Sequence, residues 1–590
     1  MRALVLLALL AASAAAQTPA AMRRALDHAL APIQKSAATF VQKRACVSCH
    51  HNILPLLLFP EAQSRGVAVD PGVWNALRSK TFRAIEGPNA FDDAVQAVGL
   101  NDPTPNDSFL LLAANASFLR PTRSTAVLAR RLARWQREDG HWITSDFRPP
   151  HSSSYFTATA SAIRAIAAYG TPEDRSGFAS ARQWLVQSKP ASVEDAAFRL
   201  MGLVWASAPA RDIEAARRDL LALQRSSGGW PQLPRYVDDA YSTGEALYAL
   251  SVAGTPITAP AFRSGLRFLL STQAADGTWR IHTRMLSPAE VSPEYFPTGF
   301  PYRKDEYISY AGTVWAAMAL VRALPDAGGI DASGLFAPAA ASIEDTFFDT
   351  AEQLQKKLDG GLSPDSRTAR GTTLLMMSVT DPAKVRLLLA RGADPNVRAA
   401  SGVDALTVAA SMRGTAETVR LLVQAGVPPN PPEGTHPKNT PLLMAAMTGD
   451  VEVMRLLLAC GAEPSVSALS QVVTFGYPDA VQMLIDAGAH AKVTESSGIN
   501  MLHWAAIADR PQVIPVLAGA GIDINAQDEH GFTPLMYAAT IDFGDTRVAE
   551  ALLHAGADPS ILNDAGRNAI EQARHFGHGN LEAVLRQFRH

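Results

Sequence analysis

A short glycine phrase recurs at a nearly constant spacing through the C-terminal third of this 590-residue chain. It reads GADPN at 392–396 and returns in variant form five times, the last time as GADPS at 556–560. A period near 33 residues fits one pair of short helices, and such a unit cannot bury its apolar face without a stacked neighbour. This part of the chain must therefore fold as a stack. Spacings of 34, 35, 27, 33 and 35 residues separate the leading glycines, which are Gly392, Gly426, Gly461, Gly488, Gly521 and Gly556.

Each unit contains the signals for two helices. An amphipathic segment such as VEVMRLLLA precedes the glycine, and a shorter segment such as TPLLMAAMTGD at 440–450 precedes that one. Thr440 can cap the first helix, Pro441 suits its first position, and Gly461 supplies the left-handed end of the second helix. The pattern resembles the ankyrin repeat. The resemblance implies a solenoid of about seven units over residues 345–590 that binds a protein partner.

Three details of the repeats lead to structural expectations. The unit at 466–492 is short and lacks the Thr-Pro-Leu opening, so we expect one distorted helix there. Cys460 ends a repeat helix, where a small buried apolar residue is expected. His503 and Trp504 occupy the positions of the opening motif and are expected to be structural.

A second phrase occurs three times in the middle of the chain, as WQREDGHW at 135–142, LQRSSGGW at 223–230 and TQAADGTW at 272–279. Each copy lies between two apolar helical segments. Its glutamine amide can tie down the loop that follows, while its tryptophan covers the end of a helix. The phrases resemble the QW motifs of terpenoid cyclases and related prenyltransferases. The resemblance implies an α/α toroid over residues 101–335, so the expected fold is all-α, a toroid followed by an ankyrin-repeat solenoid.

One functional hypothesis for this middle region is acid catalysis. Cyclases of the squalene-hopene type protonate an alkene with an Asp-x-Asp-Asp motif, and residues 236–239 here read Tyr-Val-Asp-Asp. Asp238 would then be the acid. The alternative is that Asp239 or Ser242 caps the helix that follows. Tyr236 replaces the first aspartate of the motif, which favours a cyclase-like scaffold without cyclase activity.

The N-terminus is typical of an exported protein. Arg2 precedes an apolar run to about Leu10, and small residues follow as far as Ala16. This pattern predicts a cleaved signal peptide over residues 1–16. A membrane span needs about 20 apolar residues, and neither this run nor any later stretch is long enough. We expect a periplasmic or secreted protein whose mature chain has no transmembrane segment.

Residues 45–52 read ACVSCHHN, inside an N-terminal helical segment expected over residues 17–100. Cys46, Cys49 and His50 form Cys-x-x-Cys-His, the attachment signature of c-type haem. One helical turn places both thiols on one face, and His50 would be the proximal ligand of the iron. Three alternatives remain: a disulfide between the two cysteines, a zinc site that no second cysteine pair completes, and a thioredoxin-like site without its usual β-α-β surroundings.

A sixth ligand of the iron is not defined by the sequence. The candidates are His51, His151, His282 and Met285, and the iron is also chemically reasonable with five ligands.

Composition excludes several classes of function. The chain has 53 Lys and Arg against 56 Asp and Glu, a net charge of −3 that offers no electrostatic footprint for nucleic acid. Its three cysteines are too few for a disulfide scaffold. We therefore expect an exported haem c protein that has a redox or sensing role and is not an enzyme, and whose repeats bind a protein. The alternatives are an ankyrin scaffold protein without haem and a terpenoid-processing enzyme that uses Asp238.

Overall fold

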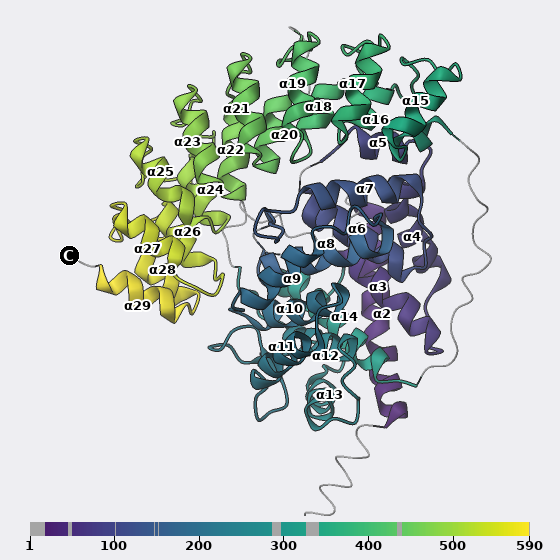
Figure 1. Ribbon diagram of the computed structural model, residues 1–590. Helices are drawn as coiled ribbons and strands as arrows, with labels where there is room; N and C mark the ends of the chain where they lie inside the picture. Colours follow the sequence, from purple (N-terminus) through teal and green to yellow (C-terminus); the bar gives the residue numbers. More distant parts are fainter. Residues whose placement is uncertain are drawn as a thin grey trace, which may run out of the picture.

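A computed structural model of the chain describes residues 18–44, 50–100, 102–146, 148–151, 153–285, 297–325, 342–432 and 439–588. These residues form an almost entirely helical molecule in which an arc of short helices runs along a larger helical body (Figure 1). The predicted signal peptide, Cys46 and Cys49 lie outside the described residues. None of the described helices combines the length and apolar character that a membrane span requires.

The helices of the N-terminal body alternate between outer and inner positions. The outer helices are α2 (Pro19–Lys43), α4 (Pro71–Glu86), α7 (Arg123–Arg134), α9 (Phe178–Gln187), α11 (Ala210–Ala222) and α13 (Pro260–Thr272). The inner helices are α3 (His50–Ser64), α6 (Pro103–Ala116), α8 (Tyr155–Tyr169), α10 (Val193–Trp205), α12 (Ala240–Val252) and α14 (Glu306–Arg322). The connecting loops contain α5 (Ala90–Val95), the 3-10 turn η1 (Arg303–Asp305) and an antiparallel pair, β1 (Trp230–Pro231) and β2 (Asp238–Asp239).

The six inner helices contact one another in a closed order, and we call them the ring. Helix α3 packs on α6, the contacts continue through α8, α10 and α12 to α14, and α14 packs back on α3. Small residues allow this close approach: a Cβ atom added to Gly244 of α12 would lie 2.5 Å from the backbone nitrogen of Ala316 in α14. Helix α14 is buried on nearly all sides, which explains why its sequence is apolar all round.

The three glutamine-tryptophan phrases join consecutive outer helices. Each glutamine Nε2 donates to the carbonyl of the glycine four residues later, at 2.8–2.9 Å. It also donates at 2.8 Å to a carbonyl of the next outer helix, which is Gly177 for Gln136, Ala261 for Gln224 and Ala25 for Gln273. Because Ala25 belongs to α2, the N-terminal helix takes the place of the outer helix that follows α13.

The tryptophans of these phrases are buried and cap the outer helices that precede them. The indole nitrogens of Trp142, Trp230 and Trp279 donate to the carbonyls of Leu132, Leu220 and Leu269 at 2.7, 2.9 and 3.0 Å. The roles predicted for the glutamine and the tryptophan are therefore confirmed.

Seven helix pairs stack in the C-terminal part, which we call the array. The first helices of the pairs are α16 (Leu374–Ser378), α18 (Ala405–Ala410), α20 (Pro441–Thr448), α22 (Val466–Phe475), α24 (Met501–Ile507), α26 (Pro534–Thr540) and α28 (Ala569–His575). The second helices are α17 (Pro382–Ala390), α19 (Ala416–Gln424), α21 (Val451–Ala459), α23 (Pro478–Asp486), α25 (Ile514–Gly519), α27 (Arg547–His554) and α29 (Gly579–Gln587). Before them stand the 3-10 turn η2 (Ile343–Phe347) and α15 (Ala351–Asp359), and the 3-10 turn η3 (Pro511–Val513) leads into α25.

The local signals of the repeats act as predicted, with two exceptions. Thr440 Oγ1 accepts a hydrogen bond from the Leu443 nitrogen at 3.2 Å, and Gly461 has a φ of 89°. The expected distortion at 466–492 is wrong, because Ser465 caps a regular α22 in place of the missing threonine. The expected burial of Cys460 is also wrong: it ends α21 on the outer side of the array and is exposed.

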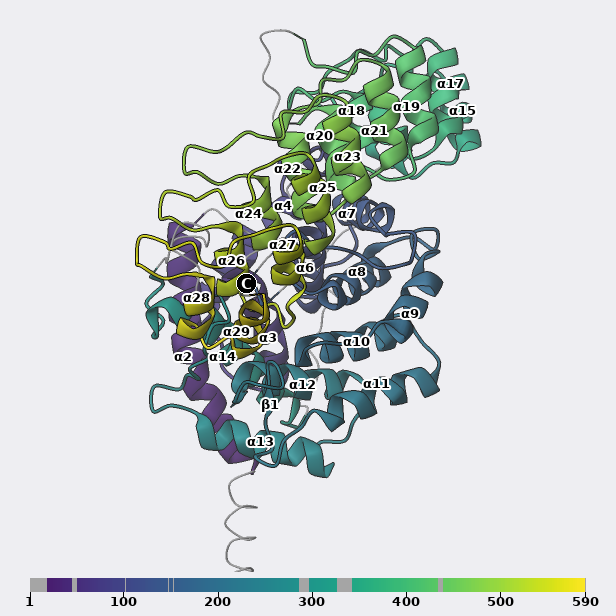
Figure 2. The same cartoon turned by 90° about the vertical axis from the view of Figure 1, so that its left-hand side faces the viewer.

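The array packs along the end of the ring at which the inner helices begin. Figure 1 shows the first helices, such as α18, α20 and α22, on the inner side of the arc, and Figure 2 shows the arc from the side. The turns after α18, α24 and α26 make several of the contacts. The Trp135 indole nitrogen donates to the Ser411 carbonyl at 2.9 Å, and Arg510 Nη2 donates to the Thr144 carbonyl at 2.5 Å. The Tyr236 hydroxyl donates to Asp542 Oδ2 at 2.8 Å.

Candidate functional site

His50, the described residue of the Cys-x-x-Cys-His motif, is the first residue of α3 in the ring. It lies at the end of the ring that the array covers. Its ring nitrogen Nε2 is buried and has no hydrogen-bond partner among the described residues. Burial holds the pKa of His50 well below its usual value, and the neighbouring His51, His151 and Arg148 lower it further. The imidazole is therefore neutral, which is the form that ligates metals.

Two more histidines and two tyrosines surround His50. The ring centroid of His151 lies 5.7 Å from that of His50, and those of Tyr307 and Tyr310 lie at 6.0 and 6.2 Å. His51 is stacked between Phe40 and Tyr310, at 4.9 and 4.1 Å. Burial lowers the pKa of His51 to about 3 and that of His151 to about 4. The described residues thus place three neutral imidazoles together in an aromatic environment.

The donor chemistry of His50 fits an axial ligand of haem iron. An unpaired, buried imidazole nitrogen is costly unless a ligand or an ion satisfies it. Within the described part of the chain, no group of three or more His, Cys, Asp or Glu side chains is arranged to hold a metal ion.

Of the other candidate iron ligands, some lie beside His50 and some do not. His51 and His151 lie beside His50, as described above. The side chain of His282 is instead 56% exposed, and its Nδ1 lies 3.9 Å from Asp305 Oδ1. Met285 forms a backbone β-bridge with Ile541 of the array. The structure brings together His50, His51 and His151 and leaves His282 and Met285 apart from them.

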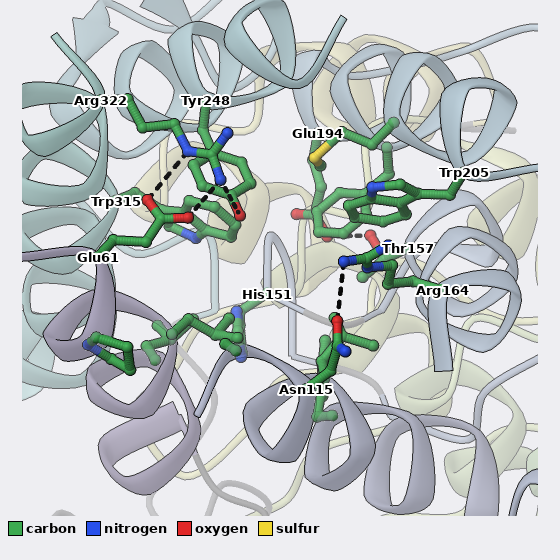
Figure 3. A pocket seen from close by; sticks show the side chains of 18 of the residues that line it. Glu61, Asn115, His151, Thr157, Arg164, Glu194, Trp205, Tyr248, Trp315 and Arg322 are labelled. Atoms are coloured by element: carbon green, nitrogen blue, oxygen red, sulfur yellow. Dashed lines mark hydrogen bonds and ion pairs between the residues drawn. The ribbon is translucent and has the colours of Figure 1, made fainter. Parts of the chain in front are cut away.

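A cavity of about 260 Å³ lies in the centre of the ring (Figure 3). All six inner helices contribute to its wall, and His151 lines it near the ends at which α8 and α10 begin. Its walls are mainly apolar, with Phe198, Trp205 and Trp315 as the largest side chains. A cavity that is mostly apolar and has a few polar groups is typical of small-molecule sites, although this one is slightly below their usual range of about 300–1,000 Å³.

The polar groups of this cavity form three sets. Arg322 Nε donates to Glu61 Oε2 at 3.0 Å, and its guanidinium lies 4.3 Å from the ring centre of Tyr248. The Thr157 hydroxyl donates to Glu194 Oε1 at 2.6 Å. Arg164 Nη2 donates to the amide oxygen of Asn115 at 2.8 Å, and its guanidinium lies 5.9 Å from the ring centre of Trp205.

Asp238 and Asp239 lie outside the cavity wall. Asp238 is 3.5 Å from Arg225 Nε, in the loop of the second glutamine-tryptophan phrase. Asp239 Oδ1 accepts a hydrogen bond from the Ser242 nitrogen at 2.9 Å and caps α12, as the alternative interpretation predicted. Burial raises the pKa of Asp239 to about 6. The hypothesis that Asp238 is a catalytic acid therefore gains no support from the cavity.

Sequence reasoning missed the polar residues of the cavity. Glu61, Arg164 and Arg322 each stand alone in an otherwise apolar helical segment, such as YFTATASAIRAIAAY of α8. A single charged residue within such a segment is the signal that indicates a partly buried polar function.

Comparisons with known proteins concern the array. The family model of ankyrin repeats matches residues 374–468 and 469–578. An ADP-ribosylation factor GTPase-activating protein, AGD2 of Arabidopsis thaliana, is 34% identical over 107 residues, which is 17% of this chain and 14% of that protein. SH3 and multiple ankyrin repeat domains protein 1 of Mus musculus is 31% identical over 165 residues, 28% of this chain and 6% of that protein.

A further curated protein and a solved structure also match the chain. Neurogenic locus notch homolog protein 2 of Homo sapiens is 34% identical over 119 residues, 20% of this chain and 5% of that protein. The crystal structure of the human ASB11 ankyrin repeat domain aligns with a TM-score of 0.32 and 21% identity, over 37% of this chain and 97% of that one. The chain thus spans a small fraction of the length of these curated relatives. The C-terminal part consists of ankyrin repeats, a module typical of protein-protein interaction.

Proposed function

We propose that this protein is an exported haem c protein with a redox or sensing role. Cys46 and Cys49 would attach the porphyrin and His50 would ligate the iron. In this proposal a cyclase-like α/α toroid, the ring with its outer helices, holds the haem, and the ankyrin repeats bind a protein partner.

The observation that carries the proposal is the state of His50. Its Nε2 is buried and has no partner among the described residues, burial holds its pKa well below the usual value, and it directly follows the second cysteine of the motif in the sequence. A buried polar nitrogen of this kind calls for a ligand, and a histidine at this position of the motif is the usual iron ligand.

The residues around His50 would set the environment of a bound haem. When bound, the haem would supply an iron centre for electron transfer or for binding a small ligand. The aromatic side chains of Tyr307 and Tyr310 lie beside His50 and would keep the surroundings of the iron apolar. A low dielectric around the iron is one means by which proteins tune its potential.

Support for the toroid comes from two features of the fold. The inner helices contact one another in a closed order and alternate with outer helices, as they would in an α/α toroid. The glutamine-tryptophan phrases make equivalent contacts after α7, α11 and α13, the last of which reaches back to α2.

Spectroscopy on cysteine variants tests the haem proposal. The full chain is expressed with a signal peptide in a host that carries the cytochrome c maturation system. We expect a pyridine haemochrome α band and an intact mass increased by one haem. The double variant Cys46→Ser/Cys49→Ser should lose both signals. The matched control Cys460→Ser should keep them, because Cys460 is the exposed third cysteine of the chain.

A wild-type protein without the α band and without the added mass would contradict the proposal. The function would then be that of an ankyrin scaffold protein without haem, and a mass two hydrogens lower than the reduced chain would identify the disulfide between Cys46 and Cys49.

A further inference from the structure

We propose that the cavity in the centre of the ring binds a small amphipathic carboxylate, with the carboxylate on Arg164 and the apolar body against Trp315 and Phe198. The cavity is enclosed by residues of all six inner helices, every one of which belongs to the described part of the chain. The proposal goes beyond the haem site, because His50, the described residue of the Cys-x-x-Cys-His motif, is not part of the wall of this cavity.

Arg164 is the group that selects the charge of the ligand. The cavity contains two arginines, and Arg322 is already paired with Glu61. Arg164 makes no ion pair with any described residue, and the amide of Asn115 accepts only one of its N–H groups. A half-buried guanidinium that faces a cavity without a carboxylate partner recognises an anion, and its planar fork matches a carboxylate.

Trp315 supplies a second, independent sign of a ligand. Its side chain lines the cavity and is 4% exposed, yet its indole N–H has no hydrogen-bond partner among the described residues. Buried indole N–H groups usually have a partner. A ligand oxygen or a water molecule that accompanies the ligand would satisfy this donor.

The remaining wall determines the apolar body of the ligand. Trp315 packs edge-on against Phe198 and Tyr248, with ring centroids 6.3 and 5.5 Å apart, and Leu54 and Met201 also line the cavity. Large aromatic and aliphatic surfaces favour an alkyl or aryl chain. The volume of about 260 Å³ favours a medium-length chain over a long one.

Calorimetric titration of the full chain with octanoate and with octanamide tests the proposal. The two probes have the same chain and similar head groups, but only octanoate carries a charge. We expect octanoate to bind at least about tenfold more tightly than octanamide, as the loss of one charge-assisted contact implies. Arg164→Gln should remove this preference, and Arg164→Lys should retain part of it. The control Arg211→Gln, an exposed arginine of α11, should leave the preference unchanged.

A further variant locates the binding site. Ala116 lines the cavity, so the side chain introduced by Ala116→Trp should fill part of it. We expect the affinity for both probes to fall about tenfold or more. Equal affinities for the two probes, or a preference that survives in Arg164→Gln, would overturn the assignment of the carboxylate to Arg164. The absence of binding for both probes at millimolar concentration would overturn the cavity as a site for this class of ligand.

Discussion

Asp542 follows the sixth first helix of the array, and its side chain is fully buried against the ring. It accepts hydrogen bonds from Arg235 and from the Tyr236 hydroxyl, and its own backbone nitrogen donates to the Arg284 carbonyl at 3.1 Å. Burial alone would raise the pKa of Asp542, but the positive charges of Arg284 and Arg235 outweigh it and lower the pKa. A single carboxylate therefore links the array to two loops of the ring.

We expect Asp542→Asn to destabilise the protein by about 2 kcal/mol at pH 7, because charged hydrogen bonds are lost inside the interface. The folded pKa lies below the unfolded value of about 3.9, so this stabilisation is present at neutral pH and is lost as the pH falls below about 4. Thermal unfolding of both proteins between pH 7 and pH 3 measures it. The difference between them should be constant to about pH 4.5 and then shrink. A difference that grows on acidification would contradict the assignment.

The same glutamine contact joins neighbouring outer helices of the N-terminal body in three places. Gln224 lies two residues after the end of α11, and its amide donates to the carbonyls of Gly228 and Ala261. Glycine is required in the loop that follows, since Gly228 has a φ of 91° and a Cβ there would lie 2.5 Å from the Ser264 carbonyl oxygen. Gln187 ends α9 in the equivalent place, but its phrase has lost the glycine and the tryptophan, and the side chain is exposed.

These two glutamines form a matched pair for mutation. Gln224→Ala should lower the free energy of unfolding by about 1–3 kcal/mol, because two half-buried carbonyls lose their donor. Gln187→Ala should change it by less than about 0.5 kcal/mol, as is usual for an exposed residue. Urea unfolding followed by far-ultraviolet circular dichroism measures both. Equal effects of the two substitutions would show that the amide contacts of Gln224 do not stabilise the ring.

At the scale of the whole molecule, the array and the ring share one extended interface. Near the start of the array, Gln96 Nε2 donates a hydrogen bond to the Thr372 hydroxyl at 2.7 Å. Near its end, the Tyr236 hydroxyl donates to the Asp542 carboxylate. Between them, Trp135 packs edge-on against Phe475 with ring centroids 6.0 Å apart. The hairpin before α16 and the turns after α18, α24 and α26 are therefore occupied by the N-terminal body. The second helices and the hairpin loops farther along the array are left for a protein partner.

We expect the two parts to unfold together in a single calorimetric transition. The triple variant Trp135→Ala/Arg510→Met/Asp542→Asn removes contacts from separate places along the interface and should split this into two transitions. A control with three exposed substitutions, Arg211→Gln, Arg420→Gln and Arg455→Gln, should keep one transition. Two transitions in the wild-type protein would mean that the interface is too weak to couple the parts.

Much of the local structure was predictable because its signals are local. The caps at Thr440 and Asp239, the left-handed glycines and the glutamine and tryptophan contacts all depend on residues within a few positions of one another, or on a phrase that repeats. The burial of Cys460 was predicted wrongly, because a residue at a helix end is buried only if it lies on the side that a neighbouring unit covers. The cavity residues Arg164 and Trp315 were missed because they are separated by about 150 positions in the sequence.

By itself, then, the sequence determined the helical repeats, their turns and the Cys-x-x-Cys-His motif, because periodic apolar residues and capping residues act over a single turn or a single unit. Only the tertiary structure decided that α14 packs back on α3 to enclose a cavity, that His50 meets His151, and that the array lies along the ring. These contacts join residues from about 100 to more than 360 positions apart. They follow from how whole surfaces fit together, and no short stretch of sequence encodes such a fit.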